Sequence, residues 1–489
     1  MSPQSLFSYT IVLYFLLLSY YGDRWLPPWH DEAVLARIGQ NLAAGNGMVN
    51  DLVGDLLPGA DRKTYWQMPL YPLLLSLWGR WFSFSLHRLR MLSRLLSAGC
   101  LILVWMLALK VGMGPYYALF PLAWTSADMT FQLVGNFVRP EALTCFFFLL
   151  CLYCLPHQQQ GEVSGRRLFL AGCFGALAFL SHPIAVPALI GLSFGLWKEI
   201  KSRWAFLVLV PTGVCLFCWL VWAATDWNTF ILQMKAHTGH KTYTFFDYLA
   251  FVVGGTFWGL THYLGVPVNP FLWSAVIVIW LLLVYRYGAP APQWLIWSSA
   301  LAYLSVTAGA EAWYPAFFVP LGCLLMAFLF HHLSSRFQRP FWAVLVGSLW
   351  LLYQLTFVAR HWVAVPYIGL EREEFFRDLS RRLPTGSSVM IANFVPDPYF
   401  YLSEKRADIK IHQMMPPSMV SGRALKQLRQ NLDFTITNYS TKGIPLLQGH
   451  TLKSWSFRFG GLADFSKAAG PSEAHLVQLR NNRQTTGDK

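Results

Sequence analysis

PPWHDEAVLARIGQNLAAGNG, residues 27–47, follows the first apolar run of the chain and carries two adjacent carboxylates, Asp31 and Glu32. Pro27 and Pro28 end the preceding run, and Asp31 is in position to cap the helix that the next residues predict. The apolar residues of that helix recur on one face, and a glycine-containing stretch ends it. We therefore expect a short surface helix with a charged first turn, directly after the first apolar run.

The composition of the chain explains why this charged pair is unusual. Of 489 residues, 55% are hydrophobic and only 13% are charged, whereas a soluble protein carries roughly 25% charged residues. Long apolar runs between short polar loops predict a polytopic α-helical membrane protein. The net charge of +14 fits basic cytoplasmic loops and does not indicate nucleic-acid binding. All eight cysteines lie in apolar runs, which favours packing roles over disulfides or metal binding.

About eleven apolar segments are predicted to cross the membrane. They are 6–21, 68–82, 95–111, 141–155, 168–181, 184–197, 204–222, 269–285, 294–308, 314–330 and 341–358. Long outer loops are predicted at 22–67, 113–140 and 223–267. From about residue 359 helix and turn signals alternate with strand patterns at 388–393, 431–440 and 475–480. The predicted division is a transmembrane domain, 1–358, and a small soluble α/β domain outside the membrane, 359–489.

The side of each loop is inferred from its basic residues. The group at 87–94 and the Arg166–Arg167 pair are both interpreted as cytoplasmic, because positive charge is enriched there. Two loops on one side require an even number of crossings between them. Residues 113–138 are therefore predicted to lie on the outer side without crossing, which puts Arg139 and Glu141 on the same side as Asp31.

Other polar and aromatic residues occur at the predicted outer ends of the crossing segments. The candidates for binding or catalysis are Tyr65, Gln67, Arg139, Glu141, His182, Lys235, His237, His240, Lys241, Trp313 and Tyr314. Each one alone also fits an ordinary role, such as a helix start, an interfacial aromatic or a solvated basic patch. Together they gather acids, bases and aromatic rings on one surface, and ionisable groups in such a setting are a functional hypothesis by default.

The order of four motifs resembles the GT-C superfamily of polyprenyl-phosphate-sugar-dependent glycosyltransferases, in particular the protein O-mannosyltransferase and lipid A aminoarabinose transferase group. The motifs are HDEA at 30–33, QMPLYPLLL at 67–75, the Arg-Leu-x-Ser-Ala segment from Arg94, and Arg-Pro-Glu at 139–141. The resemblance covers about residues 1–320. A soluble C-terminal domain is also common among bacterial relatives of this group.

The resemblance implies a GT-C fold and an enzyme of the bacterial cell envelope, in the inner membrane. It would move a hexose or pentose from a polyprenyl-phosphate carrier to a glycan, lipid or protein acceptor on the outer face, with inversion. It implies that Asp31 is the catalytic base, with Glu32 beside it and Glu141 as a second acid. These three carboxylates could also hold a divalent cation, although nothing in the sequence requires one.

The resemblance is incomplete at the donor site. Gln67 stands where many relatives have the lysine of a Lys-Pro-Pro-Leu motif. Arg139, His182 or Lys241 would then bind the donor phosphate instead. Tyr314, with Trp313 before it, corresponds to a late tyrosine of the family pattern.

Two other functions remain open on the sequence: a transporter or flippase of a lipid-linked saccharide, and a non-catalytic assembly subunit of the membrane. A transporter would carry polar residues in mid-span, and few are evident. Substitution of Asp31 separates the readings. An enzyme would lose sugar transfer and keep donor binding, whereas a scaffold would be little affected.

Overall fold

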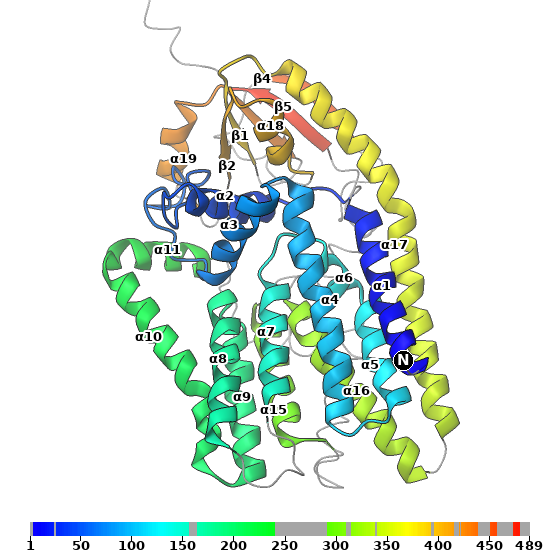
Figure 1. Ribbon diagram of the computed structural model, residues 1–489. Coiled ribbons are helices and arrows are strands. Elements are labelled where there is room, and N and C mark those ends of the chain that lie inside the picture. The colour runs from blue at the N-terminus through cyan, green and yellow to red at the C-terminus, as the bar shows by residue number, and fades with distance from the viewer. Residues whose placement is uncertain are drawn as a thin grey trace, which may run out of the picture.

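The computed structural model describes residues 3–23, 26–155, 164–239, 291–309, 314–337, 340–392, 396–414, 420, 422–438, 450–456 and 473–479. Helices predominate in these ranges and stand side by side as a bundle below a small sheet (Figure 1). The predicted crossing segment at 269–285 and three candidate site residues, His240, Lys241 and Trp313, lie outside the described residues.

The helical bundle contains most of the predicted crossing segments. Its elements are α1 (Pro3–Asp23), α4 (Leu86–Lys110), α5 (Pro115–Ala127), α6 (Met129–Gly135), α7 (Glu141–Cys154), α8 (Gly165–Ser181), α9 (Ala185–Ile200), the 3-10 helix η1 (Arg203–Leu209), α10 (Val210–Ala224), α15 (Gln293–Gly309), α16 (Pro315–Phe337) and α17 (Pro340–Arg382). At the top of the bundle, α11 (Trp227–Gly239) follows α10.

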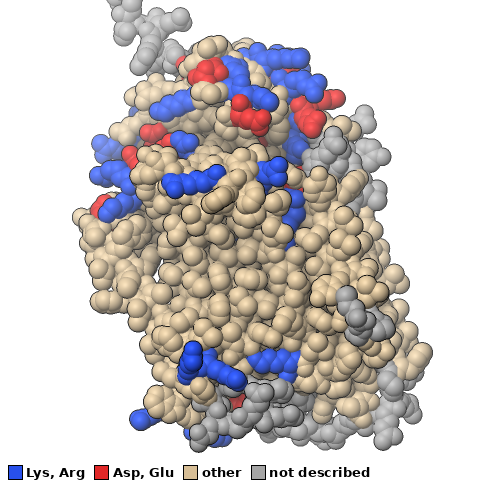
Figure 2. Space-filling model, viewed as in Figure 1, with Lys and Arg blue, Asp and Glu red and all other residues tan. Residues whose placement is uncertain are grey.

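Four helical segments in the described ranges are long and apolar enough to cross a membrane: Gln4–Asp23, Leu86–Lys110, Arg203–Ala224 and Pro315–Ser335. Charged side chains gather at the two ends of the molecule in Figure 2, and the broad band between them is almost free of charge on this face. Such a band is what the hydrocarbon core of a bilayer requires. The predicted number of eleven crossings stays a prediction.

Two short helices, α2 (His30–Ala43) and α3 (Leu70–Phe82), lie together at the top of the bundle (Figure 1). The prediction that 68–82 crosses the membrane is wrong, because α3, a helix of 13 residues, stays at the top of the bundle beside α2 (Figure 1). Near its end Arg80 donates a hydrogen bond of 3.2 Å to the carbonyl of Ala43, the last residue of α2. One face of α3 exposes large apolar side chains, as an interfacial helix does, and its hydropathy therefore resembled that of a crossing segment.

Helices α4 and α7 run in the same direction. At the top, Arg90 of α4 pairs with Glu32, and Arg139, just before α7, pairs with Asp31. At the bottom, the Lys110 ammonium at the end of α4 donates hydrogen bonds to carbonyls at the end of α7. The chain must therefore return to the top between the two helices.

Helices α5 and α6 together make that return, so the prediction that 113–138 stays on the outer side is wrong. The return is interrupted at Asp128, whose carboxylate caps α6 by accepting a hydrogen bond of 3.0 Å from the N–H of Phe131. The basic group at 87–94 misled the prediction because two of its arginines are not solvated. Arg90 and Arg94 are buried against acids at the top of the bundle, and charge bias predicts sidedness only for solvated residues.

The C-terminal unit contains a five-stranded sheet in the order β2-β1-β3-β5-β4. Its elements are β1 (Ser388–Ile391), α18 (Tyr399–Lys405), β2 (Lys410–Gln413), α19 (Gly422–Arg429), β3 (Phe434–Asn438), β4 (His450–Ser456) and β5 (Glu473–Gln478). β1 pairs in parallel with β2 and β3, and β5 is antiparallel to β3 and β4. Strands β1, β3 and β5 lie where strands were predicted.

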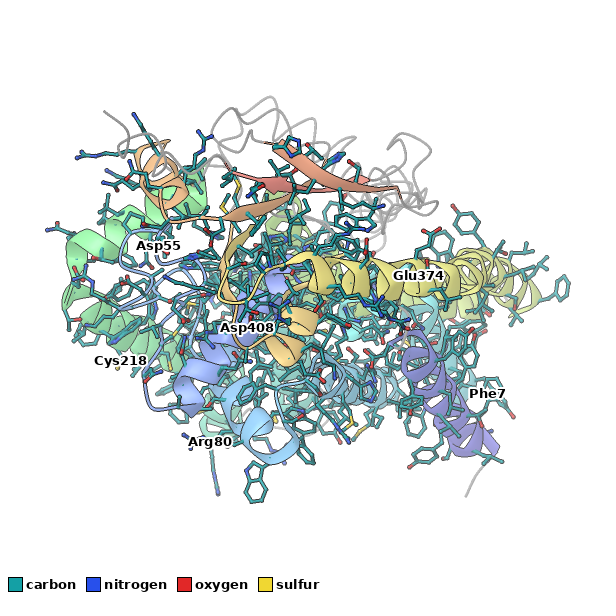
Figure 3. The ribbon with its side chains drawn as sticks, turned by 90° about the horizontal axis from the view of Figure 1, so that it is seen from above. Phe7, Asp55, Arg80, Cys218, Glu374 and Asp408 are labelled. Carbon is teal, nitrogen blue, oxygen red and sulfur yellow. The ribbon has the colours of Figure 1, made fainter. Side chains whose placement is uncertain are left out.

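The C-terminal unit is tightly attached to the bundle. α17 is one unbroken helix of 43 residues that passes through the predicted domain boundary at 358/359. Below the sheet, one hydrophobic core contains Ala33 and Val34 of α2, Phe375 of α17 and Ile436 of β3. From above, Asp55 lies beside the C-terminal strands and Phe7 of α1 lies at the far edge of the molecule (Figure 3). The sheet therefore rests directly on α2.

Candidate active site at the start of helix α2

The first turn of α2 is fixed by Glu32. The helix begins at His30 and its N-cap is Trp29, whose N–H donates a hydrogen bond of 2.9 Å to Glu32 Oε2. Arg90 donates two hydrogen bonds to Glu32, one of 2.8 Å from Nε to Oε1 and one of 2.6 Å from Nη2 to Oε2. The backbone N–H of Val138 donates a third, of 2.9 Å, to Oε1. Glu32 is fully buried, and these bonds engage both of its oxygens in holding α2 to α4 and to the segment before α7.

Asp31, beside it, has a different environment, and the prediction that it caps α2 is wrong. Its side chain is 37% exposed. Asp31 Oδ1 lies 2.8 Å from His30 Nε2, and Oδ2 lies 2.5 Å from Arg139 Nη1. Of the three predicted acids, Asp31, Glu32 and Glu141, only Asp31 is open to solvent.

Arg139 faces two carboxylates at once. Its Nε and Nη2 donate to fully buried Glu141 over 2.8 to 3.2 Å, while Nη1 alone reaches Asp31. Glu141 is therefore the firm anchor of the guanidinium, and Asp31 is its exposed partner. The structure thus brings together Asp31, Arg139 and Glu141, which were predicted to share one surface. Their roles stay predictions.

The charges of the site support each other. The part of Asp31 that is buried opposes its ionisation, but the adjacent His30 and the Arg139 guanidinium outweigh this effect and lower the pKa of the carboxyl. Burial likewise opposes protonation of His30, but the Asp31 carboxylate outweighs it and raises the pKa of the imidazole. His30 is thus a site residue that the sequence reasoning missed, although it belongs to the HDEA motif.

His182 and Tyr314 extend the site. His182 ends α8, and its Nδ1 accepts a hydrogen bond of 3.1 Å from the N–H of Ile184. Its ring packs edge-to-face on Tyr314, with 5.0 Å between the ring centroids. Tyr314 in turn lies close enough to Arg139 to interact with its charge. This aromatic pair therefore borders the arginine, as a binding role for both residues would require.

The remaining described candidates gather around α10 and α11. Tyr65 is fully buried between two aromatic rings of these helices, 4.7 and 5.9 Å away by centroid. The ring of His237 packs on Trp66 at 5.7 Å, and Lys235 is exposed. Gln67 is half-buried. Tyr65 thus has a packing role in the structure, and donor binding by this group stays a prediction.

A metal-binding arrangement is not evident in the part of the chain that the structure describes. There, no three His, Cys, Asp or Glu side chains are grouped so as to hold an ion. Glu32 and Glu141 are already bound by Arg90 and Arg139, so the carboxylates named as possible ligands do not form a metal site in this arrangement.

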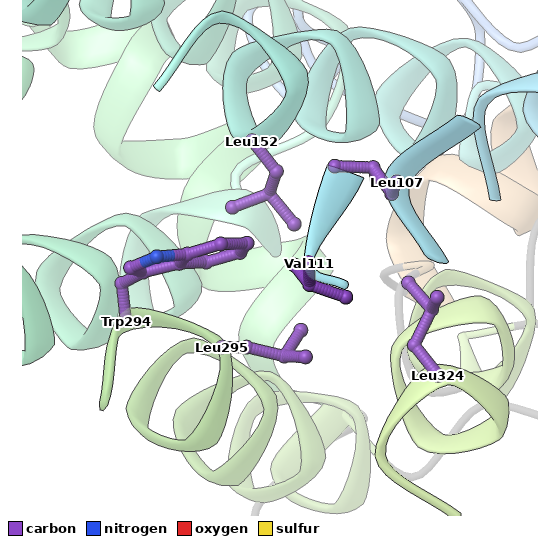
Figure 4. A pocket seen from close by; sticks show the side chains of 6 residues that line it. All are labelled: Leu107, Val111, Leu152, Trp294, Leu295 and Leu324. Atoms are coloured by element: carbon purple, nitrogen blue, oxygen red, sulfur yellow. The ribbon is translucent and has the colours of Figure 1, made fainter. Parts of the chain in front are cut away.

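A narrow apolar pocket without room for a water molecule lies far from these charges (Figure 4). Its lining residues are Leu107, Val111, Leu152, Trp294, Leu295 and Leu324. Leu107, Val111 and Leu152 belong to the bottom ends of α4 and α7, whereas the site is at their top. The pocket is therefore not part of the candidate site.

The fold is shared with solved structures. The chain resembles ArnT from Cupriavidus metallidurans in the apo state (12% identity, 98% of this chain and 99% of that chain, TM-score 0.52). It also resembles the same protein bound to undecaprenyl phosphate (11%, 96% and 97%, TM-score 0.52). A third similar structure is the Archaeoglobus fulgidus oligosaccharyltransferase tethered with an acceptor peptide (11%, 93% and 73%, TM-score 0.53).

No family model matches the chain, and no curated protein matches it. At these identities the structural likeness concerns the fold alone. It covers nearly the whole chain, including the C-terminal unit, and it confirms the GT-C fold that the motif order predicted.

Proposed function

We propose that this protein is a membrane glycosyltransferase that moves a sugar from a polyprenyl-phosphate carrier to an acceptor hydroxyl at the membrane surface. The shared fold supports this, since one similar structure holds undecaprenyl phosphate and another an acceptor peptide. The observation that carries the proposal is the contrast between the acids. Glu32 and Glu141 are buried and bound by arginines, while Asp31 is exposed beside the same cationic group.

The proposed reaction is a single displacement with inversion. The acceptor oxygen attacks the anomeric carbon as Asp31 takes the hydroxyl proton. The bond between the anomeric carbon and the phosphate oxygen breaks, and its electron pair leaves with the lipid-bound phosphate. Arg139, which contacts Asp31, and His182, whose ring packs on Tyr314, would stabilise this phosphate.

The position of Arg139 suggests how the base is activated. In the resting site the guanidinium lowers the proton affinity of Asp31. A donor phosphate that binds Nη1 would take over the bond that now goes to Asp31 Oδ2, while Glu141 keeps hold of Nε and Nη2. Asp31 would then lose one cationic partner and become a stronger base only when the donor is present.

The orientation follows from the basic residues at the bottom of the bundle. They are Lys110, Arg166, Arg167, Lys198, Lys201 and Arg203. Because positive charge is enriched in the cytoplasm, we infer that this end is cytoplasmic. The site and the C-terminal unit would then lie on the outer face of the membrane. In a bacterium this membrane would be the inner membrane. The acceptor is a glycan, lipid or protein of the cell envelope.

Buried polar residues in the α5–α6 return could suggest a transporter, because that function needs polar groups in mid-span. However, Gln132 donates a hydrogen bond of 2.5 Å to the carbonyl of Ser126, and Asn136 donates 2.7 Å to the carbonyl of Gln132. These side chains satisfy backbone groups near the helix break at Asp128. The enzyme reading therefore remains the better one.

The test is a mass comparison of membrane lipids and glycans from cells that produce the wild type or Asp31→Asn. We expect the wild type to add one glycosyl unit to an acceptor and Asp31→Asn to abolish the addition. Asp51→Asn is the matched control, because Asp51 pairs with Arg37 on the solvent side of α2, and it should keep the product. Unchanged product with Asp31→Asn would overturn the proposal.

A further inference from the structure

The C-terminal unit contacts the segment that leads into the candidate site. The backbone N–H of Asp397, in the loop before α18, donates a hydrogen bond of 2.9 Å to the carbonyl of Pro28. Two residues on, the Tyr399 hydroxyl donates 3.2 Å to Gln40 Oε1 near the end of α2. The C-terminal unit is thus attached both to the segment just before α2, two residues before His30, and to the last turns of α2.

The side chain of Asp397 is a buried charge with neutral partners. It is fully buried. Its Oδ1 accepts a hydrogen bond from the N–H of Tyr399 and its Oδ2 from Nε2 of Gln413, both at 2.7 Å. In the described part of the chain no Lys or Arg forms an ion pair with it. An asparagine could accept the bond from Tyr399 without the cost of burying a charge, so capping alone does not explain an aspartate here.

The charge of Asp397 acts on His30. Three charged groups influence the pKa of this imidazole: Asp31 on its own helix, Asp397 from the C-terminal unit, and Arg139 before α7. Asp31 and Asp397 favour the imidazolium and Arg139 opposes it. Asp397 also faces Glu32. The unit above the membrane thus contributes an acid to the electrostatics of the His30–Asp31 pair without touching it.

We propose that Asp397 is a positioning residue of the transferase site, which holds the entry to α2 through Pro28 and keeps His30 paired with Asp31 through its negative charge. The inference rests on the proposed function, and it makes the C-terminal unit a working part of the site. Burial raises the pKa of this carboxyl to about 6, so it is largely charged at neutral pH.

The experiment compares Asp397→Asn with wild type and with Tyr399→Phe, all as full-length protein in proteoliposomes. Asp397→Asn removes the charge and keeps the shape, since an amide can still bond to Tyr399 and to a rotated Gln413. Tyr399→Phe removes the bond to Gln40 and leaves Asp397 intact. Donor KM and kcat are measured across pH.

For Asp397→Asn we expect kcat to fall roughly tenfold or more through loss of positioning, with the donor KM unchanged because Arg139 is retained. The limb of the pH profile that reports His30 should move to lower pH, since one of the acids that favour the imidazolium is lost. Tyr399→Phe should keep the wild-type pH profile. Unchanged kcat and pH profile in Asp397→Asn, or an equal shift in both variants, would overturn the inference.

A second readout does not depend on sugar transfer. Diethyl pyrocarbonate modifies neutral imidazole, and His30 is 12% exposed, so its modification can be followed against pH by peptide mass analysis. The midpoint should be lower in Asp397→Asn than in wild type. A shifted midpoint in a protein that transfers no sugar would refute the proposed function and leave the coupling standing. Active protein with an unshifted midpoint would refute the coupling.

Discussion

At the residue scale, the environment of each carboxylate separates structural from chemical roles. Glu141 is fully buried and holds two nitrogens of Arg139, while Asp31 is exposed and receives one. Removing one partner of a buried ion pair leaves the other charge without compensation, which costs about 3–5 kcal/mol. An exposed partner can be replaced by water at little cost.

The two acids should therefore respond differently to the same change. We expect Glu141→Gln to lower the free energy of unfolding by about 3–5 kcal/mol and Asp31→Asn to change it little while abolishing transfer. Thermal unfolding in detergent, together with a transfer assay, measures both effects. Equal destabilisation by the two variants would contradict this assignment.

The His30–Asp31 pair predicts a pH dependence of stability. The pKa of His30 is raised in the folded state above its usual 6.5, so the pair adds to the free energy of unfolding below pH 6.5. That contribution is lost as pH rises through the raised pKa. Asp31 stays ionised across this range because its own pKa is lowered.

His30→Gln keeps a donor for Asp31 and removes the charge. The melting temperature of wild type should exceed that of His30→Gln most at about pH 5 and progressively less toward about pH 9. Melting curves at a series of pH values provide the measurement. A difference independent of pH would mean that the imidazolium charge contributes nothing.

The sequence predicted the neighbourhood of Asp31, Arg139 and Glu141 but not their contacts. Two errors cancelled: the segment now seen as α3 was counted as a crossing, and the α5–α6 return was not. Glu141 was therefore predicted on the same side as Asp31, and the structure has the two acids at the same end of the bundle. The sequence did not indicate a role for Asp397, because no local pattern links this residue to His30, more than 300 positions earlier.

At the element scale, the hydropathy of a segment identified helices better than it identified crossings. Of the predicted crossing segments that the structure describes, each largely overlaps one helix, except 204–222, which is divided between η1 and α10. What the hydropathy did not predict was how some of these helices lie relative to the membrane. A short apolar helix can lie along a surface, and a crossing can be divided by a capped break such as the one at Asp128. Neither feature changes the mean hydropathy much.

The α3–α4 turn provides a test of this placement. It contains exposed Ser85, and the start of α8 is preceded by exposed Ser164 at the opposite end of the bundle. In intact cells, Ser85→Cys should react with a membrane-impermeant maleimide from the outside. Ser164→Cys should react only after permeabilisation.

Both cysteine variants are made with Cys218→Ser, because Cys218 is the exposed native cysteine. Labelling of both positions from the same side would refute the return through α5 and α6. Labelling of Ser164→Cys alone would instead place the site and the C-terminal unit in the cytoplasm.

At the scale of the whole molecule, the charged site lies where three parts of the chain meet. α2 is covered from above by the C-terminal sheet, and its first turn is bound from the sides by α4 and the segment before α7. A loop at 50–64 joins the same assembly, with Asp55 2.9 Å from His412 of β2. The likeness to solved structures at 12% identity or less extends over all of these parts. Packing of this kind depends on long-range contacts, which hydropathy and motif spacing do not encode.

The sandwiched position of α2 has a consequence for folding. Ala33 and Val34 belong to the core below the sheet, while Leu35 and Ala36 belong to a second core shared with α3 and α4. Adjacent residues of one helix thus belong to two hydrophobic cores, so neither core can unfold locally without exposing an apolar face of α2. The C-terminal unit is therefore not a detachable module, and we expect the helix that bears Asp31 to be fully packed only once β5, the last strand in the described residues, is in place.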